Sequence, residues 1–332
     1  MTLLGKKLPR VDLLRDVADD LEECMDFGDP ATAAEISGVV SVIRHYVIPR
    51  IEDPAAPLNV VFVGPTGSGK STLVNSVVGR EVTRASAMRP TTTKPLVYSH
   101  VDNPGNQPLG PLDVDLDSGD ARILRFISLV DTPDLDSTSD SNRRLALNAM
   151  AGADVVVFVT SSLRYADRVP WKALRSLAKR DIPVIHVLNR LGAETSGSVI
   201  DYRRRLRDEG MTADVLAISE YRLVPHSVLP RPAIGELRTR ILDLISEIDR
   251  GSCLESSLDA VRSNLDSAGA RLNAGLVDPA QKPDPSRLLE RVGDRDRLRD
   301  TVKHWKFDLG GSMGFLDGLF GRGRAVAMEV GR

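Results

Sequence analysis

Hydrophobic positions in the first fifty residues recur at three- and four-residue steps, which is the spacing of an α-helix. The pattern runs from Val11 to about Ile51, and Asp29-Pro30 interrupts it, so two helices are predicted. Pro49 and the stretch Asp53–Pro57 are expected to end the second helix and to form a stiff link. Residues 1–57 are therefore interpreted as an N-terminal helical extension with its linker.

Strand-like hydrophobic runs alternate with helical ones over residues 58–250. The expected strands are Val60–Val63, Leu96–Val101, Ile123–Val130, Val155–Val159, Val184–Leu188 and Val215–Ile218. Such alternation predicts an α/β domain whose mostly parallel sheet has helices on both faces. The stretch Asn103–Gly119 is rich in proline, glycine and aspartate and is interpreted as an inserted surface loop.

Helical spacing returns in residues 251–306. Leu254, Leu258, Val261, Leu265 and Leu272 lie on one predicted face, and a second helical run from Leu288 to about Lys306 follows a proline-containing break. Residues 307–332 form a tail with seven glycines and the apolar cluster Phe315–Phe320. We interpret the tail as a flexible terminus that packs its apolar cluster onto the helices; the alternative is a short element that contacts lipid or a partner.

Composition and charge are those of an ordinary globular protein. The 332 residues are 42% hydrophobic, and 44 basic against 46 acidic residues give a net charge of −2, so no overall charge favours nucleic acid or an anionic membrane. Cys24 and Cys253 lie far apart and are expected to be free thiols. With no predicted signal peptide or spanning helix, a cytoplasmic protein is expected, with peripheral membrane contact through the tail as the alternative.

Residues 64–71 read Gly-Pro-Thr-Gly-Ser-Gly-Lys-Ser, directly after an apolar strand and directly before a helix. This is the GxxxxGK[ST] phosphate-binding loop, or P-loop. Its glycines allow a tight turn that points backbone N–H groups at a phosphate, Lys70 reaches the β- and γ-phosphates, and Ser71 ligates Mg²⁺. The predicted nucleotide contacts here are Gly64, Pro65, Thr66, Gly67, Ser68, Gly69, Lys70, Ser71 and Thr72.

Two further segments have side chains suited to a magnesium site. The predicted strand ending at Val130 is followed by Asp131-Thr132-Pro133, in which the Asp131 carboxylate would support the Mg²⁺ shell. The polar loop Arg89–Pro95 supplies hydroxyl groups, and Thr92 or Thr93 is expected to complete the shell when a γ-phosphate is present. Lys70, Thr92, Thr93 and Asp131 are the predicted catalytic group.

The order of four motifs in this chain resembles that of translation-factor-class P-loop GTPases, and in particular bacterial dynamin-like GTPases of the actinobacterial type. The motifs are Gly64–Ser71, Arg89–Thr92, Asp131–Pro133 and Leu188–Arg190, and the stretch Phe158–Trp171 is also similar. The resemblance covers about residues 58–220. It implies GTP and GDP binding with Mg²⁺, self-association or an activating partner, and a helical bundle formed by segments 11–51 and 251–306.

The base-binding motif departs from this family. The resemblance implies that Asn189 ties its loop to the P-loop and that Arg190 stacks on the base. The carboxylate that accepts two guanine N–H groups is replaced by Gly192, so recognition of guanine over adenine is weaker or is supplied elsewhere. Glu194 and Glu220 are candidate substitutes, with Ser219 in the same predicted base-side group.

Two departures concern hydrolysis. Asp134 stands where the family usually has glycine, and its carboxylate would repel a γ-phosphate unless it is turned away or linked through Mg²⁺. Gly67 lacks the side chain with which related GTPases position the attacking water, so slow intrinsic hydrolysis is expected. Two alternatives therefore stay open: an ATPase, and a nucleotide-gated scaffold without turnover.

Other conspicuous side chains are assigned structural roles. His186 lies within an apolar strand and is expected to be a core histidine with a local hydrogen bond. Trp171 is expected to be a packing residue, and the arginines between Arg203 and Arg207 a solvated helix face.

Overall fold

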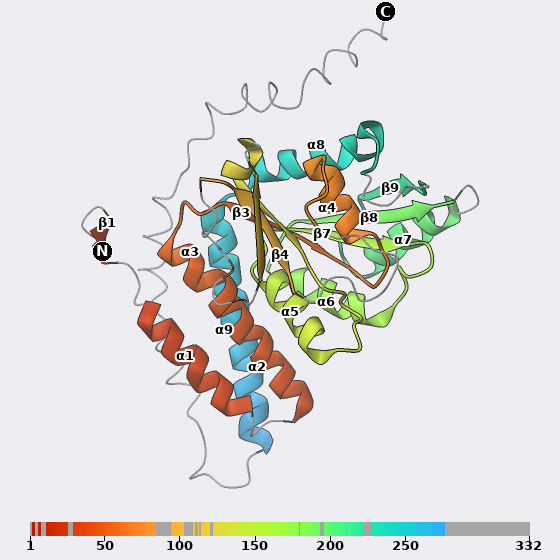
Figure 1. The fold of residues 1–332 in the computed structure, drawn as a ribbon. Helices are drawn as coiled ribbons and strands as arrows, with labels where there is room; N and C mark the ends of the chain where they lie inside the picture. Colours follow the sequence, from red (N-terminus) through yellow and green to blue (C-terminus); the bar gives the residue numbers. More distant parts are fainter. Residues whose placement is uncertain are drawn as a thin grey trace, which may run out of the picture.

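A seven-stranded sheet forms the centre of the structure, which is a computed structural model (Figure 1). The structure describes residues 2–3, 6–7, 11–25, 29–83, 94–102, 109, 112, 114–119, 122–178, 180–192, 196–221 and 228–275. The strand order is β5-β4-β6-β3-β7-β8-β9, and every neighbouring pair is parallel except β4 and β6. The strands are β3 (Leu58–Val63), β4 (Leu96–His100), β5 (Asp115–Gly119), β6 (Ile127–Asp131), β7 (Val155–Ser161), β8 (Val184–Leu191) and β9 (Val215–Ser219). The predicted mostly parallel α/β sheet is confirmed.

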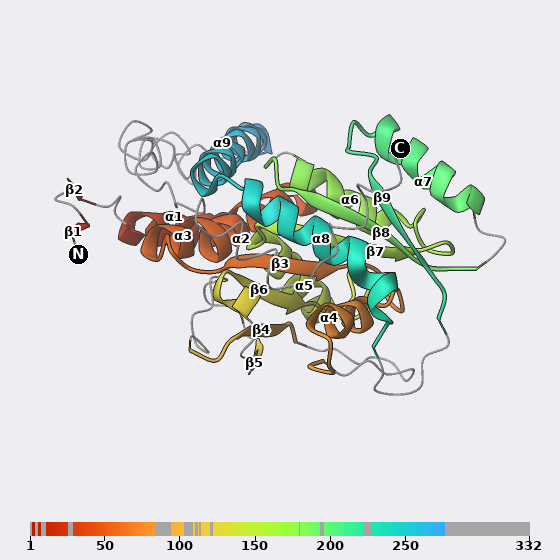
Figure 2. The ribbon, with the colours of Figure 1, turned by 90° about the horizontal axis from the view of Figure 1, so that it is seen from above.

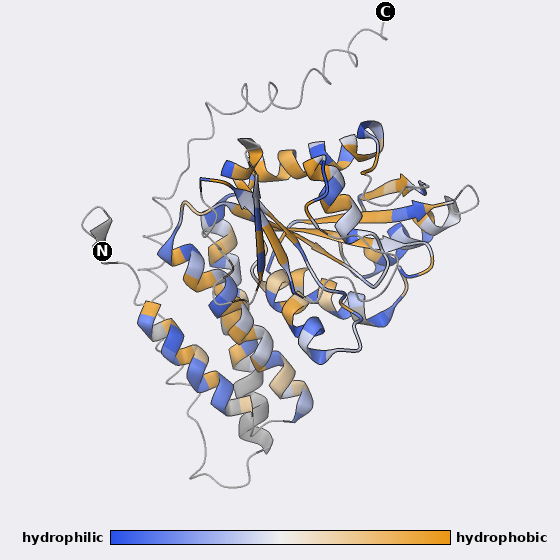
Figure 3. Ribbon diagram, viewed as in Figure 1, coloured by the Kyte–Doolittle hydropathy of each residue, from blue (hydrophilic) through white to orange (hydrophobic). Residues whose placement is uncertain are grey.

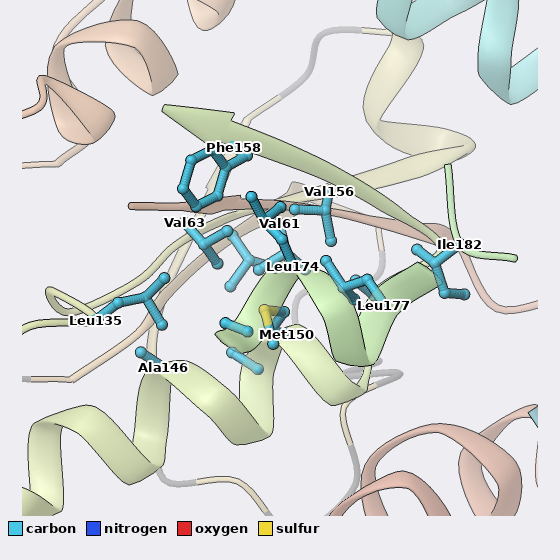
Figure 4. Close-up of a cluster of buried hydrophobic side chains, with 14 of the residues drawn as sticks. Val61, Val63, Leu135, Ala146, Met150, Val156, Phe158, Leu174, Leu177 and Ile182 are labelled. Carbon is cyan, nitrogen blue, oxygen red and sulfur yellow. The ribbon is translucent and has the colours of Figure 1, made fainter. Parts of the chain in front are cut away.

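Helices cover both faces of this sheet, as predicted. One face packs against α5 (Asp140–Ala151), α6 (Arg168–Ala178) and α7 (Ser196–Asp208). The other packs against α4 (Lys70–Val78) and α8 (Arg231–Glu247). Figure 4 shows the first of these cores, in which Val61 and Val156 of the sheet face Met150, Leu174 and Leu177 of the helices. Because β3 and β7 are buried on both sides, their sequences are nearly continuous apolar runs.

Two strand predictions were wrong in part. Asp115–Gly119, predicted within a surface loop, forms β5, which pairs in parallel with β4 from Leu96 to His100. Its sequence is polar because this edge strand is held by backbone pairing while most of its side chains are exposed or half-buried. The strand predicted to begin at Ile123 begins at Ile127, because Arg122–Arg125 forms a 3₁₀ turn.

The N-terminal segment forms α1 (Val11–Cys24), α2 (Pro30–Val42) and α3 (Ile48–Glu52). Asp29 caps α2 by accepting hydrogen bonds from the backbone N–H groups of Ala31 and Thr32. The prediction that Pro49 ends the second helix was wrong. A π-helical turn, Ile43–Val47, joins α2 to α3, and Pro49 sits in the first turn of α3, where no N–H donor is required.

A helical bundle packs beside the sheet. It combines α1, α2 and α3 with α9 (Arg250–Gly275), and Figure 2 shows α9 alongside these N-terminal helices. Of the predicted apolar face of α9, Leu254, Leu258, Val261 and Leu265 are buried in the bundle core. Figure 3 colours the ribbon by hydropathy: the central strands are mostly hydrophobic, whereas helices such as α1 also carry hydrophilic residues. Segments more than 200 residues apart in sequence therefore share one core.

Other predicted features lie outside the described residues, among them the helix from Leu288 to Lys306 and the tail 307–332. Two short strands, β1 (Thr2–Leu3) and β2 (Lys6–Lys7), pair with each other near the N-terminus. No helix in the described part of the chain is long and apolar enough to cross a membrane.

Candidate nucleotide site

The P-loop follows the central strand β3. This strand lies between β6 and β7, which both come later in the chain and lie on opposite sides of it. In open α/β sheets such a reversal of strand order leaves a crevice at the carboxyl ends of the strands, where ligands bind. Residues 64–69 connect β3 to α4 at this end.

Two glycines of the loop are fixed by close contacts. A Cβ atom on Gly64 would lie 1.9 Å from the carbonyl oxygen of Val159 on β7. Gly69 has φ +98°, and a Cβ there would lie 2.4 Å from Nδ2 of Asn189. Any larger side chain at either position would push the loop away from the sheet, so the motif's glycine spacing follows from this packing.

Lys70 is buried under the loop, with 5% of its side chain exposed. Its Nζ donates to the carbonyl oxygens of Gly64 at 3.1 Å and Pro65 at 3.3 Å. It also forms an ion pair with Oδ1 of Asp134 at 2.5 Å. The sequence predicts that the Asp134 carboxylate would repel a γ-phosphate unless it is turned away or linked through Mg²⁺. In the structure this carboxylate forms an ion pair with Lys70 of the P-loop.

Ser71 and Asp131 lie together at the start of α4 and the end of β6. The Ser71 hydroxyl donates to Oδ2 of Asp131 at 2.6 Å, and the Thr83 hydroxyl donates to the same oxygen at 2.7 Å. Burial raises the pKa of Asp131, and the hydrogen bond from Ser71, the Lys70 charge and the hydrogen bond from Thr83 oppose that rise. Thr83 was not among the residues predicted from sequence.

The arrangement of Ser71 and Asp131 fits a magnesium ion. Oδ1 of Asp131 is buried and has no hydrogen-bond partner among the residues that the structure describes, which leaves one carboxylate oxygen for a cation or its water shell. Hydroxyl and carboxylate oxygens are the ligands that Mg²⁺ prefers, and the ion commonly takes only one or two protein ligands beside substrate phosphates. Among the described residues no cluster of three or more acidic, histidine or cysteine side chains forms a metal cage.

A second carboxylate, that of Asp136, accepts hydrogen bonds from the P-loop. Asp136 accepts hydrogen bonds from the backbone N–H and the hydroxyl of Thr66, both at 2.7 Å. It also forms an ion pair with Arg164, whose Nε donates to Asp167 at 2.7 Å. Burial acts to raise the pKa of Asp136, but the Thr66 hydrogen bonds and the Arg164 charge lower it overall.

Asp136 and Arg164 were not singled out as site residues in the sequence. Asp136 belongs to a run of acidic residues after β6, with Asp131 and Asp134, and Arg164 lies within the stretch Phe158–Trp171 noted for its resemblance. Their pairing depends on the β7–α6 connection reaching the P-loop, which local sequence does not reveal.

The predicted base-side residues lie beside the P-loop. Nδ2 of Asn189 donates to the carbonyl oxygen of Ser68 at 2.9 Å, so this predicted tie between the two loops is present. Arg190 has φ +58°, an unusual value for a residue with a side chain, and the pairing of β8 with β9 is irregular between Leu188 and Leu191. A Cβ atom added to Gly69 would lie 3.7 Å from Nε of Arg190, so this side chain lies beside the P-loop.

Ser219 and Glu220, of the predicted base-side group, lie next to the end of β8. Ser219 pairs with Leu191 at the end of β9, and the Glu220 N–H donates to the carbonyl oxygen of Leu191 at 2.9 Å. Both residues, and Gly192, are exposed. The alternative carboxylate, Glu194, lies outside the described residues, as do Thr92, Thr93 and the rest of 84–93. Thr72 is half-buried on α4.

The residues given structural roles behave as expected. His186 is buried, and its Nδ1 lies 3.0 Å from the Tyr202 hydroxyl; burial lowers its pKa to about 4. Trp171 is buried and donates from Nε1 to the Tyr165 carbonyl. On α7 the arginines at 203, 204, 205 and 207 are exposed.

The two cysteines were expected to be free thiols. Cys253 is a free thiol, and burial raises its pKa to about 11. The Cys24 side chain lies outside the described residues.

Several solved GTPase structures are similar to this chain. Era from Aquifex aeolicus, bound to GDP·AlF4⁻, is 17% identical with a TM-score of 0.39, covering 57% of this chain and 56% of Era. A bacterial dynamin from an oligomerised pair that senses and tethers membranes is 11% identical with a TM-score of 0.46, covering 80% and 48%. Toc33 from Arabidopsis thaliana, with Mg²⁺ and GMPPNP, is 18% identical with a TM-score of 0.38, covering 65% and 93%. This chain thus spans about half the length of the Era and dynamin structures.

A match to a protein family covers the part of the chain that holds the candidate nucleotide site. No curated protein matches the chain. Residues 59–190 match the family described as "50S ribosome-binding GTPase", and this range holds the P-loop, Asp131, Asn189 and Arg190. Together with the sheet order and the glycine-dependent loop after β3, this match supports the fold of a P-loop GTPase domain for residues 59–190.

Proposed function

We propose that this protein is a Mg²⁺-dependent, GTP-hydrolysing switch of the dynamin-like type, in which the nucleotide state of the GTPase domain acts on the helical bundle. The observation that carries the proposal is the meeting of Lys70, the Ser71–Asp131 pair and Asn189 at one end of the sheet. These side chains match three requirements: a charge for phosphates, oxygen ligands for magnesium and a contact near the base.

On the phosphate side, Lys70 and the backbone N–H groups at the start of α4 bind and neutralise the phosphates. Ser71 holds Mg²⁺ directly and Asp131 supports its water shell, with Thr92 or Thr93 from the preceding loop completing the shell. When bound, Mg²⁺ neutralises charge that develops on the phosphate oxygens during hydrolysis.

On the base side, Asn189 keeps its loop against the P-loop, and the planar guanidinium of Arg190 stacks on the base. Guanine selectivity then requires an acceptor other than residue 192. Glu220 is the described carboxylate best suited to this role, because its backbone is bonded to Leu191, next to Gly192. A hydrogen-bonding acceptor here would favour guanine, whose N–H groups adenine lacks at the same positions.

Intrinsic turnover is proposed to be slow. Gly67 contributes no side chain to orient a water molecule, and catalysis of phosphoryl transfer depends mainly on such positioning and on charge. A second copy of the chain or another protein would then supply the missing group, so the rate would rise with self-association or partner binding.

Helix α5 is the proposed connection to the bundle. It begins at Asp140, directly after the segment that contains Asp131, Asp134 and Asp136. At its other end Asn148 accepts a hydrogen bond from Ser41 of α2 at 2.8 Å. A shift of the segment after β6 would therefore move a helix whose far end is bonded to the bundle.

The proposal is tested by phosphate release from GTP with Mg²⁺, compared with ATP, for the wild type, Lys70→Ala and the control Lys172→Ala. Lys172 is exposed on α6. We expect GTP hydrolysis that Lys70→Ala abolishes and Lys172→Ala leaves unchanged. Hydrolysis of ATP alone would move the protein to the ATPases. Nucleotide binding together with phosphate release that Lys70→Ala does not change would favour a scaffold without turnover.

A further inference from the structure

We propose that Asp134 is a specificity-determining residue that takes the place of a terminal phosphate on Lys70, so that the site prefers guanosine diphosphate to the triphosphate. This inference rests on the proposed function, because it concerns the same nucleotide site. It assigns a role to the residue by which this chain departs from the glycine expected at that position.

Lys70 has a limited number of hydrogen-bond donors. An ammonium group has three N–H donors. Two of them are directed at the P-loop carbonyl oxygens of Gly64 and Pro65. Oδ1 of Asp134 takes the third at 2.5 Å. A phosphate oxygen that approaches Lys70 must therefore compete with the Asp134 carboxylate for this donor.

Asp134 is held in position by its neighbours. The N–H of Leu135 donates to the Gly64 carbonyl at 3.2 Å, and Asp136 accepts two hydrogen bonds from Thr66. The segment after β6 is thus bonded to the P-loop at the two residues that directly follow Asp134. The carboxylate does not reach Lys70 from a distant surface; it belongs to a segment already attached to the loop.

The Lys70–Asp134 ion pair is mostly buried. The Lys70 side chain is 5% exposed and that of Asp134 is 25% exposed. Water screens such a pair less than it screens a surface pair, and a hydrogen bond between two charged groups is among the stronger ones in proteins. Displacing the carboxylate therefore opposes binding of any group that needs the same donor.

These contacts distinguish the two nucleotides. Asp134 follows Asp131 of the proposed magnesium site by three residues and contacts the P-loop lysine, so a triphosphate's last phosphoryl group is expected near its carboxylate. A diphosphate needs Lys70 only for its β-phosphate, which can take a donor now bonded to a P-loop carbonyl oxygen, so the Asp134 carboxylate stays on Lys70 as a counter-charge. A triphosphate has to remove this carboxylate from Lys70 and also brings further negative charge close to it.

The test compares Asp134→Asn with the wild type by calorimetric binding of GDP and the non-hydrolysable triphosphate GMPPNP, both with Mg²⁺. Asparagine keeps the size of the side chain and removes its charge. The matched control is Asp140→Asn, which removes the same charge six residues later, where Asp140 is exposed and paired with Arg143 on α5. Circular dichroism verifies that each variant is folded.

We expect Asp134→Asn to bind GMPPNP at least about tenfold more tightly than the wild type does, with GDP affinity changed less than about threefold. The control should change neither affinity. An unchanged GMPPNP affinity, or equal gains for both nucleotides, would overturn the inference and leave the proposed function standing. Failure of the wild type and Asp134→Asn to bind either guanine nucleotide would overturn both.

Discussion

Arg50 of α3 and Asp154, immediately before β7, form an ion pair in which both side chains are almost completely buried, at 5% and 1% exposure. Arg50 also donates to the carbonyl oxygens of Ala56 and Pro57, each at 3.0 Å, and Asp154 accepts from the Asn59 N–H at 2.7 Å. The pair therefore attaches the bundle to the amino ends of the central strands, opposite the P-loop.

Replacing Arg50 with alanine should strongly destabilise the protein. The change leaves the Asp154 carboxylate buried without its counter-charge, and removing one partner of a buried ion pair costs about 3–5 kcal/mol. Urea unfolding measures this loss of unfolding free energy.

The matched control is Arg15→Ala, because Arg15 pairs with Glu52 on the surface, where both side chains are about half exposed. Its loss should lower the unfolding free energy by less than about 1 kcal/mol. Equal costs for the two variants would show that the buried pair does not hold the bundle to the sheet.

His186 should make stability depend on pH. Burial lowers its pKa from 6.5 to about 4, so between these values the unfolded chain binds a proton that the folded chain does not. Stability contributed by the neutral histidine is complete above pH 6.5 and is lost as the pH falls towards 4, by about 2 kcal/mol at pH 5. Urea unfolding at pH 7.5 and 5 measures this, and His186→Asn should remove that share of the loss. A variant with the same pH dependence as the wild type would contradict the assignment.

Asn189→Ala should weaken nucleotide binding by up to about tenfold, the value of one hydrogen bond. The reason is loss of the 2.9 Å bond to the Ser68 carbonyl, which holds the base-side loop against the P-loop. Lys172→Ala, at an exposed position on α6, serves as the control. Calorimetric GDP affinity that is the same for both variants would argue against this role.

Asp131 should account for most of the Mg²⁺ dependence of GDP binding. Wild-type affinity for GDP should fall when EDTA replaces Mg²⁺, and Asp131→Asn should lose most of that difference, because a neutral amide supports the cation poorly. Asp140→Asn, an exposed acidic neighbour on α5, should retain the wild-type response. If Asp131→Asn responds to Mg²⁺ as the wild type does, the metal is held elsewhere.

The parts of the fold that follow from local pattern were predictable. Nearly continuous apolar runs located the central strands, which are buried on both faces, and period-3.6 spacing located the helices, which are buried on one. Strand β5 was missed because an edge strand is stabilised through the backbone of β4 and places little demand on its own side chains. The passage of a helix through Pro49 was missed because local pattern does not reveal the π-helical turn before it, where hydrogen bonds span one residue more than in an α-helix.

The candidate site, like the fold, was predictable only in part. The P-loop motif specifies its own geometry, and Asn189 contacts Ser68 as expected. The pairing of Lys70 with Asp134, and of Asp136 with Thr66 and Arg164, depends on how three connections meet at one end of the sheet. Residue identity gave the charges, but only the packed structure decides which opposite charge each one meets.

The most direct test of a guanine-nucleotide switch is calorimetric binding of GDP and ADP with Mg²⁺, with Lys70→Ala as the control. The account predicts GDP binding at least about tenfold tighter than ADP binding, with both lost in Lys70→Ala. Equal affinities, or a preference for ADP, would contradict it.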